Sequence, residues 1–271
     1  MNTKKLAVIL IAVAFSLVVI FSGVGILTIK KVEVNYAVAD TTDTREVQTI
    51  LDGFLGKNLL FFNTDEVEKS LEEEHYFEVL SVEKKYPNVL SVNIKERREI
   101  YYFEFNEKVF VTTADGFVLN SWDKSAFSGE IARDKIVFDT GDVNIREMEL
   151  GQIIKTDNDE LMTAVFEMAK SVNLSDCIKT IKLSKTLGYE NVFVAELDSY
   201  TGVKILIDDV LVKGSEKADK IFDAYNDELS DFEKNEGQII SMLMYDGRYR
   251  VTYVNECDDQ TTSRVILTFQ P

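Results

Sequence analysis

The stretch YPNVLSVNIKER, residues 86–97, decides the fold of the first folded part of this chain. Apolar and polar residues alternate from Leu90 to Ile94, which predicts a strand with one buried face. Pro87 fits a tight turn before this strand, because its ring fixes φ and it has no N–H to offer to a neighbouring strand. We therefore expect a turn that leads into an amphipathic strand, which ends at the charged pair Glu96 and Arg97.

The residues upstream of this stretch predict the rest of a small domain. A short alternating strand is expected over 32–36, followed by a helix over 47–54 and a second helix from Asn63, with Glu66 placed for a capping box. Another strand is expected over 79–84. The order strand, helix, helix, strand, strand predicts a three-stranded sheet whose helices cover one face.

Residues 6–29 carry no charge and are mostly apolar. A helix of this length is about 36 Å long, enough to cross a hydrocarbon core of about 30 Å. We expect a short cytoplasmic tail at 1–5, with Lys4 and Lys5, then one transmembrane helix and an extracytoplasmic body. The alternative is a cleaved secretory signal, whose apolar region is usually shorter.

Composition narrows the function. The 271 residues carry a formal net charge of −17, which disfavours nucleic-acid binding by electrostatic repulsion. The chain has one histidine, His75, for which a surface or capping role is expected, and no spacing typical of a metal site or a catalytic motif. We predict no cofactor, no metal and no enzyme activity. Cys177 and Cys257 form a disulfide or remain as two buried thiols, and the sequence leaves both open.

The second folded part, residues 99–255, predicts many strands and two helices, over about 157–172 and from Ser215. This pattern is typical of an α+β fold with a mainly antiparallel sheet. Asp246-Gly247 predicts a tight hairpin turn between two late strands. The tail, residues 256–271, holds one more apolar run, RVILTFQ, which predicts a further strand over 264–270.

Several short motifs resemble the FtsQ/DivIB family of bacterial cell-division proteins, which carry a POTRA domain followed by a β domain. The motifs that carry the resemblance are Val32-x-Val34, Gly56-Lys57-Asn58-Leu59, Tyr86-Pro87-Asn88-Val89-Leu90 with Ile94-x-Glu96-Arg97, and Asp115-Gly116-Phe117-Val118-Leu119. The chain departs from the family pattern at Glu99, near which the family usually has proline. The POTRA-like domain is expected over 30–98 and the β domain over 99–255.

The resemblance implies a function and a set of residues. It implies a non-enzymatic scaffold of the divisome, held in the cell membrane at the division septum. Its expected partners are bitopic coiled-coil proteins of the FtsL and FtsB/DivIC types, bound by strand addition at an edge of the β domain. The residues expected at that edge are Tyr245, Tyr249, Val251 and Tyr253.

Three alternatives stay open. Glu96 and Arg97 mark a domain junction by resemblance, or form a solvated ion pair of little energetic weight. The strand over 264–270 covers the partner-binding edge, is itself the edge, or becomes ordered only when a partner binds. The protein is a division scaffold or another membrane-anchored extracytoplasmic protein, such as a POTRA-bearing export factor or a wall-active hydrolase with an unrecognised site.

Overall fold

The structure is a computed structural model that describes residue 13 and residues 26–37, 44–171, 177–186, 192–229, 238–245, 248–257 and 260–269. The chain forms two compact units, Met1–Arg97 and Arg98–Pro271. Among the described residues, no helix has the length and apolarity needed to cross a bilayer. Most of the predicted transmembrane segment, residues 6–29, lies outside the described residues.

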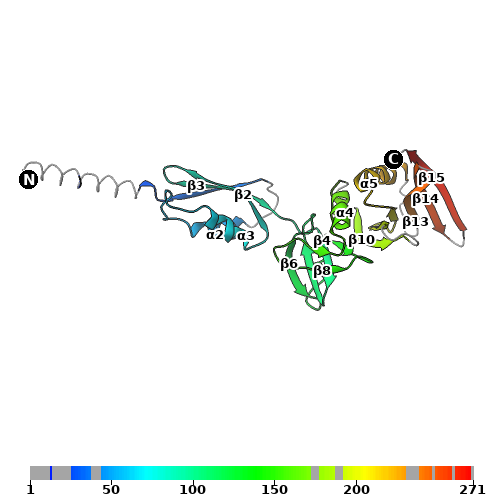
Figure 1. Cartoon of the computed structure of the whole chain (residues 1–271), viewed down its shortest axis with the longest axis horizontal. Coiled ribbons are helices and arrows are strands. Elements are labelled where there is room, and N and C mark those ends of the chain that lie inside the picture. The colour runs from blue at the N-terminus through cyan, green and yellow to red at the C-terminus, as the bar shows by residue number, and fades with distance from the viewer. Residues whose placement is uncertain are drawn as a thin grey trace, which may run out of the picture. The chain divides into compact units, whose positions relative to one another are not determined.

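The first unit is built on a three-stranded sheet in the order β1-β3-β2. Strand β1 (Lys31–Tyr36) runs parallel to β3 (Val89–Glu96), and β2 (Phe77–Lys85) runs antiparallel to β3. Helices α2 (Thr44–Asp52) and α3 (Asp65–Glu72) pack against one face (Figure 1). The predicted β-α-α-β-β order of the POTRA-like domain is confirmed.

The core of this unit follows from the alternation in β3. Leu90, Val92 and Ile94 are fully buried, because every second side chain of a strand points to the same face. They pack against Val47 and Leu71 of the two helices. The Tyr86–Pro87 peptide bond that precedes this strand is cis.

The start of α3 differs from the expected capping box. The Asn63 side chain accepts a hydrogen bond from the Asp65 N–H (3.1 Å), but the Glu66 carboxylate does not turn back to Asn63. Glu66 instead pairs with Lys57 at 2.7 Å. The N-cap residue of α3 is Thr64 and not Asn63, and its side chain makes no capping hydrogen bond, so the capping-box prediction is wrong.

The first unit begins inside the segment that was predicted to span the membrane. Ile29 is 1% exposed and belongs to the core of the domain. Its N–H donates to the Lys57 carbonyl (2.9 Å), and Thr28 forms a bridge with Asn58. Residues 27–29 thus form part of the folded domain and lead directly into β1, which pairs with β3.

The second unit is built on a ten-stranded sheet. Its strands, in the order in which they lie side by side, are β15 (Gln260–Phe269), β14 (Arg248–Cys257), β13 (Gln238–Tyr245), β12 (Lys204–Ile207), β11 (Phe193–Ser199), β10 (Ile178–Lys185), β7 (Ile136–Asp139), β4 (Tyr101–Phe105), β5 (Lys108–Thr112) and β6 (Val118–Asp123). A separate pair joins β8 (Ile145–Glu147) to β9 (Lys155–Thr156). Most neighbours are antiparallel, and parallel pairs join β4 to β7, β7 to β10 and β12 to β13.

The helices of the second unit supply the other layer of its core. They are α4 (Asp159–Ser171), α5 (Gly214–Asp223) and the π-helical turn η2 (Ala224–Glu228). An aromatic cluster joins sheet and helix, since the Phe166 ring of α4 packs 5.6 Å from Tyr101 and 5.7 Å from Phe138. The predicted α+β class with a mainly antiparallel sheet is confirmed.

Candidate partner interface

The ten-stranded sheet ends at β15, which forms one of its two outer strands. β15 pairs antiparallel with β14 along nearly its whole length, from Tyr249↔Phe269 to Cys257↔Gln260. Within the described part of the chain, no strand pairs with its other side. The predicted extra strand over 264–270 therefore exists, begins earlier than expected, and is the outer strand of this sheet.

The strand that was predicted to bind partners is an interior strand. β14 lies between β13 and β15, so both of its backbone edges are already hydrogen-bonded. Tyr249, Val251 and Tyr253 are 2%, 0% and 5% exposed and belong to the core. They do not lie at an open edge, because β15 pairs with β14 along the edge that was expected to be free. Their part in partner binding stays a prediction. Tyr245 ends β13 opposite Arg248, and its side chain lies outside the described set.

The edge presented by β15 carries little charge, although its register with β14 shifts between Val251 and Thr252, as at a β-bulge. Its ten residues, QTTSRVILTF, contain no lysine and no proline, and Arg264 is their only charged residue. Val265 is 52% exposed. An outer strand offers a row of unpaired N–H and C=O groups, and lysine, proline or short length normally blunts it. This edge is therefore open to an added strand.

A buried lysine supports the inner face of the strand next to this edge. Lys217 of α5 is 1% exposed, and its Nζ donates to the carbonyls of Asp208 (2.7 Å) and Asp209 (2.8 Å). The same ammonium lies 4.6 Å from the centre of the Tyr249 ring. Burial lowers the pKa of Lys217, and the nearby Asp209 and Asp208 carboxylates oppose that shift. One cation thus joins the β12–α5 turn to β14.

The segment SEKADK, residues 215–220, has four charged residues in six, a pattern typical of a solvated helix face, but Lys217 is buried. The available signal was its spacing, since Lys217 lies four residues before Ile221 and eight before Tyr225, both buried. Positions spaced by four residues share one helix face. Hydrophobic patterning alone misses such a residue because lysine is rarely buried.

The charged pair at the end of β3 closes the first unit. The Arg97 guanidinium donates to the carbonyls of His75 (3.1 Å) and Phe77 (2.6 Å), and its backbone N–H donates to Tyr76. His75 ends the α3 region with a positive φ of 56°, consistent with the expected role near a helix end. Arg97 thus fastens the last residues of β3 to the beginning of β2. A hinge role for Glu96 and Arg97 stays a prediction.

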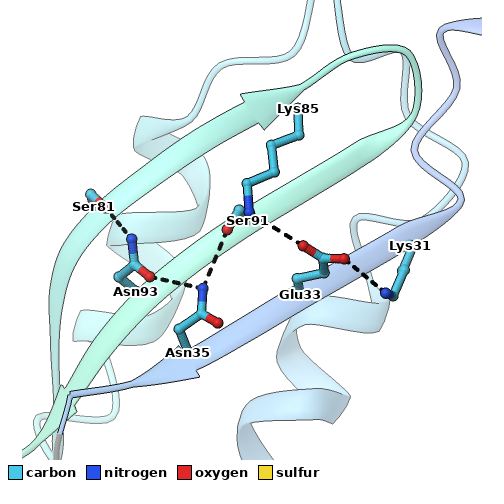
Figure 2. A network of polar contacts seen from close by, with 7 residues as sticks. All are labelled: Lys31, Glu33, Asn35, Ser81, Lys85, Ser91 and Asn93. Atoms are coloured by element: carbon cyan, nitrogen blue, oxygen red, sulfur yellow. Dashed lines mark hydrogen bonds and ion pairs between the residues drawn. The ribbon is translucent and has the colours of Figure 1, made fainter.

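The face of the first sheet opposite the helices carries a polar network (Figure 2). Asn35 donates to Asn93 (2.9 Å) and to Ser91 (3.4 Å), and Asn93 donates to Ser81 (2.6 Å). The amide ladder therefore connects β1, β3 and β2 in turn. Beside it, the Glu33 carboxylate accepts from Lys31 (2.8 Å) and Lys85 (3.3 Å). These contacts hold the parallel pairing of β1 and β3 from the open face.

A groove of about 470 Å³ on the second unit runs along α4 and is a second site to consider. Its lining includes three carboxylates, those of Asp115, Asp159 and Glu167. Asp115 accepts the Thr113 hydroxyl, and Asp159 accepts the Thr156 N–H (2.6 Å) and hydroxyl (3.1 Å). These two carboxylates thus stabilise turns. Within the described residues, no group of three or more His, Cys, Asp or Glu side chains could hold a metal ion.

Cys177 and Cys257 both lie in the second unit. Cys177 is half-buried and packs against the core of the second unit. Cys257 ends β14, and its side chain lies outside the described set. The prediction of a disulfide or of two buried thiols therefore stays open.

Comparison with known proteins identifies the first unit. Residues 27–97 match the family model described as "POTRA domain, FtsQ-type". The comparisons confirm the predicted relationship to the FtsQ/DivIB family. The matched range of this POTRA domain begins at 27, where the ladder with residues 56–59 begins, and ends at Arg97.

Two curated relatives are cell division proteins DivIB. The protein of Clostridium acetobutylicum is 25% identical over 64 residues, which is 24% of this chain and 26% of that protein. The protein of Clostridium tetani is 29% identical over 66 residues, which is 24% of this chain and 25% of that protein. The chain thus matches about a quarter of the length of each relative.

A solved structure also resembles the chain at a low level. It is the major extracytoplasmic domain of the trans isomer of the bacterial cell division protein DivIB from Geobacillus stearothermophilus. The identity is 17%, the TM-score is 0.28, and the match covers 50% of this chain and 98% of that one. A TM-score this low does not establish a common three-dimensional arrangement of the two chains.

Proposed function

We propose that this protein is a non-enzymatic, membrane-anchored scaffold of the bacterial division machinery. In this proposal residues 6–26 lie in the cell membrane, the N-terminus is cytoplasmic, and the two folded units act on the extracytoplasmic side at the septum. The FtsQ-type POTRA domain and the two DivIB relatives support the cell-division part of the proposal. The uncharged apolar stretch supports the membrane part.

The observation that carries the partner-binding part is the nearly uncharged outer edge of β15. A bitopic coiled-coil division protein, of the FtsL or FtsB/DivIC type, contributes an extended segment that pairs with this edge. Main-chain hydrogen bonds supply the affinity, and side chains at alternate positions supply the choice of partner. Tyr249, Val251 and Tyr253 act indirectly in this proposal. Their buried side chains hold β14 against the core, and β14 is the strand with which β15 pairs.

A substitution at the edge tests this mechanism. Val265→Lys places a charge at an exposed position of β15 and should weaken the binding of a purified FtsB/DivIC-type ectodomain by about tenfold, which corresponds to about 1.4 kcal/mol. Leu80→Lys is the matched control, because Leu80 is 50% exposed on β2 of the first unit. Binding is measured by biolayer interferometry on the full chain in detergent. Equal affinities for the two variants would contradict strand addition at β15.

Localisation tests the division role separately. A fluorescent protein fused to the N-terminus, expressed at native level, should form a band at mid-cell that appears with constriction. A uniform membrane signal throughout the cell cycle would contradict the division scaffold. A Val265→Lys chain that still reaches mid-cell but fails to recruit its partner would place the defect at the interface and not in targeting.

A further inference from the structure

The chain enters the POTRA domain between two loops. On one side the Leu59 N–H donates to the Leu27 carbonyl (2.7 Å), and the Gly56 N–H donates to the Ile29 carbonyl (2.9 Å). On the other side the Lys30 N–H donates to the Asn88 carbonyl (2.9 Å). Residues 27–30 are thus fixed at one end of the domain, directly after the uncharged stretch 6–26.

Two large apolar side chains project from the first of these loops. Leu60 is 50% exposed and Phe61 is 79% exposed, the highest value among the exposed large apolar side chains of the described residues. The ladder of 27–29 with 57–59 is antiparallel, so Leu60 and Phe61 follow it toward the residues that precede Leu27. The exposed pair therefore lies where the apolar stretch meets the domain.

The exposed pair is held in place and is not part of a loose loop. The Asn58 side-chain oxygen accepts hydrogen bonds from the backbone N–H groups of Leu60 (3.0 Å) and Phe61 (3.4 Å). The residues on either side, Leu59 and Phe62, are buried at 0% and 6% exposure. Phe62 also packs edge-on against Phe54, at 5.6 Å between ring centres. The buried side chains of Leu59 and Phe62 thus hold the loop in a conformation that leaves Leu60 and Phe61 exposed to solvent.

Lysines and a tyrosine lie on the second loop and at the start of β1. Lys31 and Lys85 occupy matching positions on either side of Val89, and both contact Glu33. Lys30 is exposed beside them, and Tyr86 is 56% exposed at the tip of the β2–β3 turn. Figure 1 shows this turn at the end of the domain where β1 begins. Basic and amphipathic aromatic side chains together are typical of a surface that meets lipid head groups.

We propose that this N-terminal patch, made of Lys30, Lys31, Leu60, Phe61, Lys85 and Tyr86, rests on an anionic lipid surface. Phe61 and Leu60 enter the boundary between head groups and acyl chains, and the lysines contact lipid phosphates. This inference rests on the membrane anchoring included in the proposed function. The anchor keeps the patch at the bilayer, so that even weak lipid contacts are made continuously and fix how the domain stands on the membrane.

The covalent tether favours a bilayer over a protein as the occupant. Only a few residues separate the patch from the uncharged stretch 6–26, so the bilayer surface is the first surface that the patch meets. Charge supports the same orientation, because the chain as a whole carries −17 and most of its surface is repelled by anionic lipid. The basic end is the one that can approach.

The test places a tryptophan at the patch in the full-length chain. Trp122 is the only tryptophan, so the background variant is Trp122→Phe, with Phe61→Trp as the probe and Leu80→Trp as the control. Leu80 is 50% exposed, against 79% for Phe61, and lies in the middle of β2, five residues from Lys85, or roughly 16 Å along the strand. Each chain is reconstituted in vesicles of phosphatidylcholine with phosphatidylglycerol, with or without brominated acyl chains. Circular dichroism confirms that the variants fold.

Contact predicts that brominated lipid quenches Phe61→Trp and shifts its emission to shorter wavelength, while Leu80→Trp keeps its emission. Adding Lys30→Glu and Lys31→Glu should reduce the quenching. If the chain floats with the vesicles and Phe61→Trp is not quenched, membrane anchoring stands and the lipid contact is overturned. If Phe61→Trp then responds to a division partner, the patch is a protein interface. If the chain does not float, both the anchoring and the lipid contact are overturned.

Discussion

The two units present outer strands of opposite character. In the first unit, the outer strand β2 has the sequence FEVLSVEKK, in which four of nine residues are charged, and its register with β3 shifts between Val79 and Ser81. In the second unit, the outer strand β15 has one charged residue in ten, and its register with β14 also shifts, between Val251 and Thr252. The difference between the two strands is therefore one of charge. Both edges leave one row of backbone groups without a strand partner among the described residues.

This difference indicates which edge is built for a partner. Charged side chains on an outer strand oppose pairing with another chain, because they lose hydration when a neighbouring strand arrives. β2 carries four such charges, so its edge opposes pairing with another strand. β15 carries almost none, and a long edge with so little charge invites aggregation unless a partner covers it.

The largest expected effect separates the interior strand from the outer one. Tyr253→Ala removes a buried ring from β14 and should lower the free energy of unfolding by about 3 kcal/mol. Val265→Ala, at an exposed position on β15, should change it by less than about 0.5 kcal/mol. Urea denaturation measures both. Similar values for the two variants would contradict the burial of the Tyr253 ring in the core of the second unit.

Removing charges from β2 should make its edge available for strand pairing. Glu83→Val combined with Lys85→Val removes two charges from β2 and should promote edge-to-edge pairing between copies of the chain. Sedimentation velocity in detergent should show self-association at a concentration about tenfold lower than for the unmodified chain, a change of about 1.4 kcal/mol. A chain that stays monomeric would show that charge does not protect this edge.

A pH dependence tests the buried cation behind β14. Burial lowers the pKa of Lys217 from its usual 10.5, so the folded state releases this proton at a lower pH than the unfolded state does. Between these two pKa values the unfolded chain binds more protons, and the free energy of unfolding rises with pH by up to about 1.4 kcal/mol per pH unit.

Lys217→Met removes this titration, so the unmodified chain should gain stability relative to the variant as the pH rises toward 10.5. Lys213→Met is the control, because Lys213 lies on the surface and pairs with Glu216 at 3.5 Å. Denaturation from pH 7 upward gives the difference for each variant. A constant difference between the unmodified chain and Lys217→Met would contradict the burial of the ammonium.

The smallest expected effect lies on the open face of the first sheet. Hydrogen bonds from Lys31 and then Lys85 lower the pKa of Glu33 below its usual 4.5. The stabilisation is therefore present above pH 4.5 and is lost as the pH falls through the lowered pKa of the folded state. Glu33→Gln should be slightly less stable at pH 7 and equal to the unmodified chain in acid. Added salt should also shrink the difference, because these groups are exposed.

Local pattern determined a large part of the fold. Alternation over 90–94 placed three side chains in the core of the POTRA domain, and apolar spacing along the helices identified the faces that are buried. The order of elements and the matching motifs together pointed to the FtsQ/DivIB family. These features depend on neighbours in the chain, so a single sequence contains them.

Only the tertiary structure decided which strand forms the outer edge and which polar groups are buried. The sequence contained β13, β14 and β15 as three apolar runs, but strand order depends on pairing between segments that all have suitable alternation. The partners of Glu66 and Lys217 were likewise decided by folding. Glu66 pairs with Lys57, nine residues earlier, and Lys217 donates to the carbonyls of Asp208 and Asp209, which a turn brings close. The physical reason is that an edge or a buried charge is a property of what lies beside a residue after folding, and long-range packing selects that neighbour.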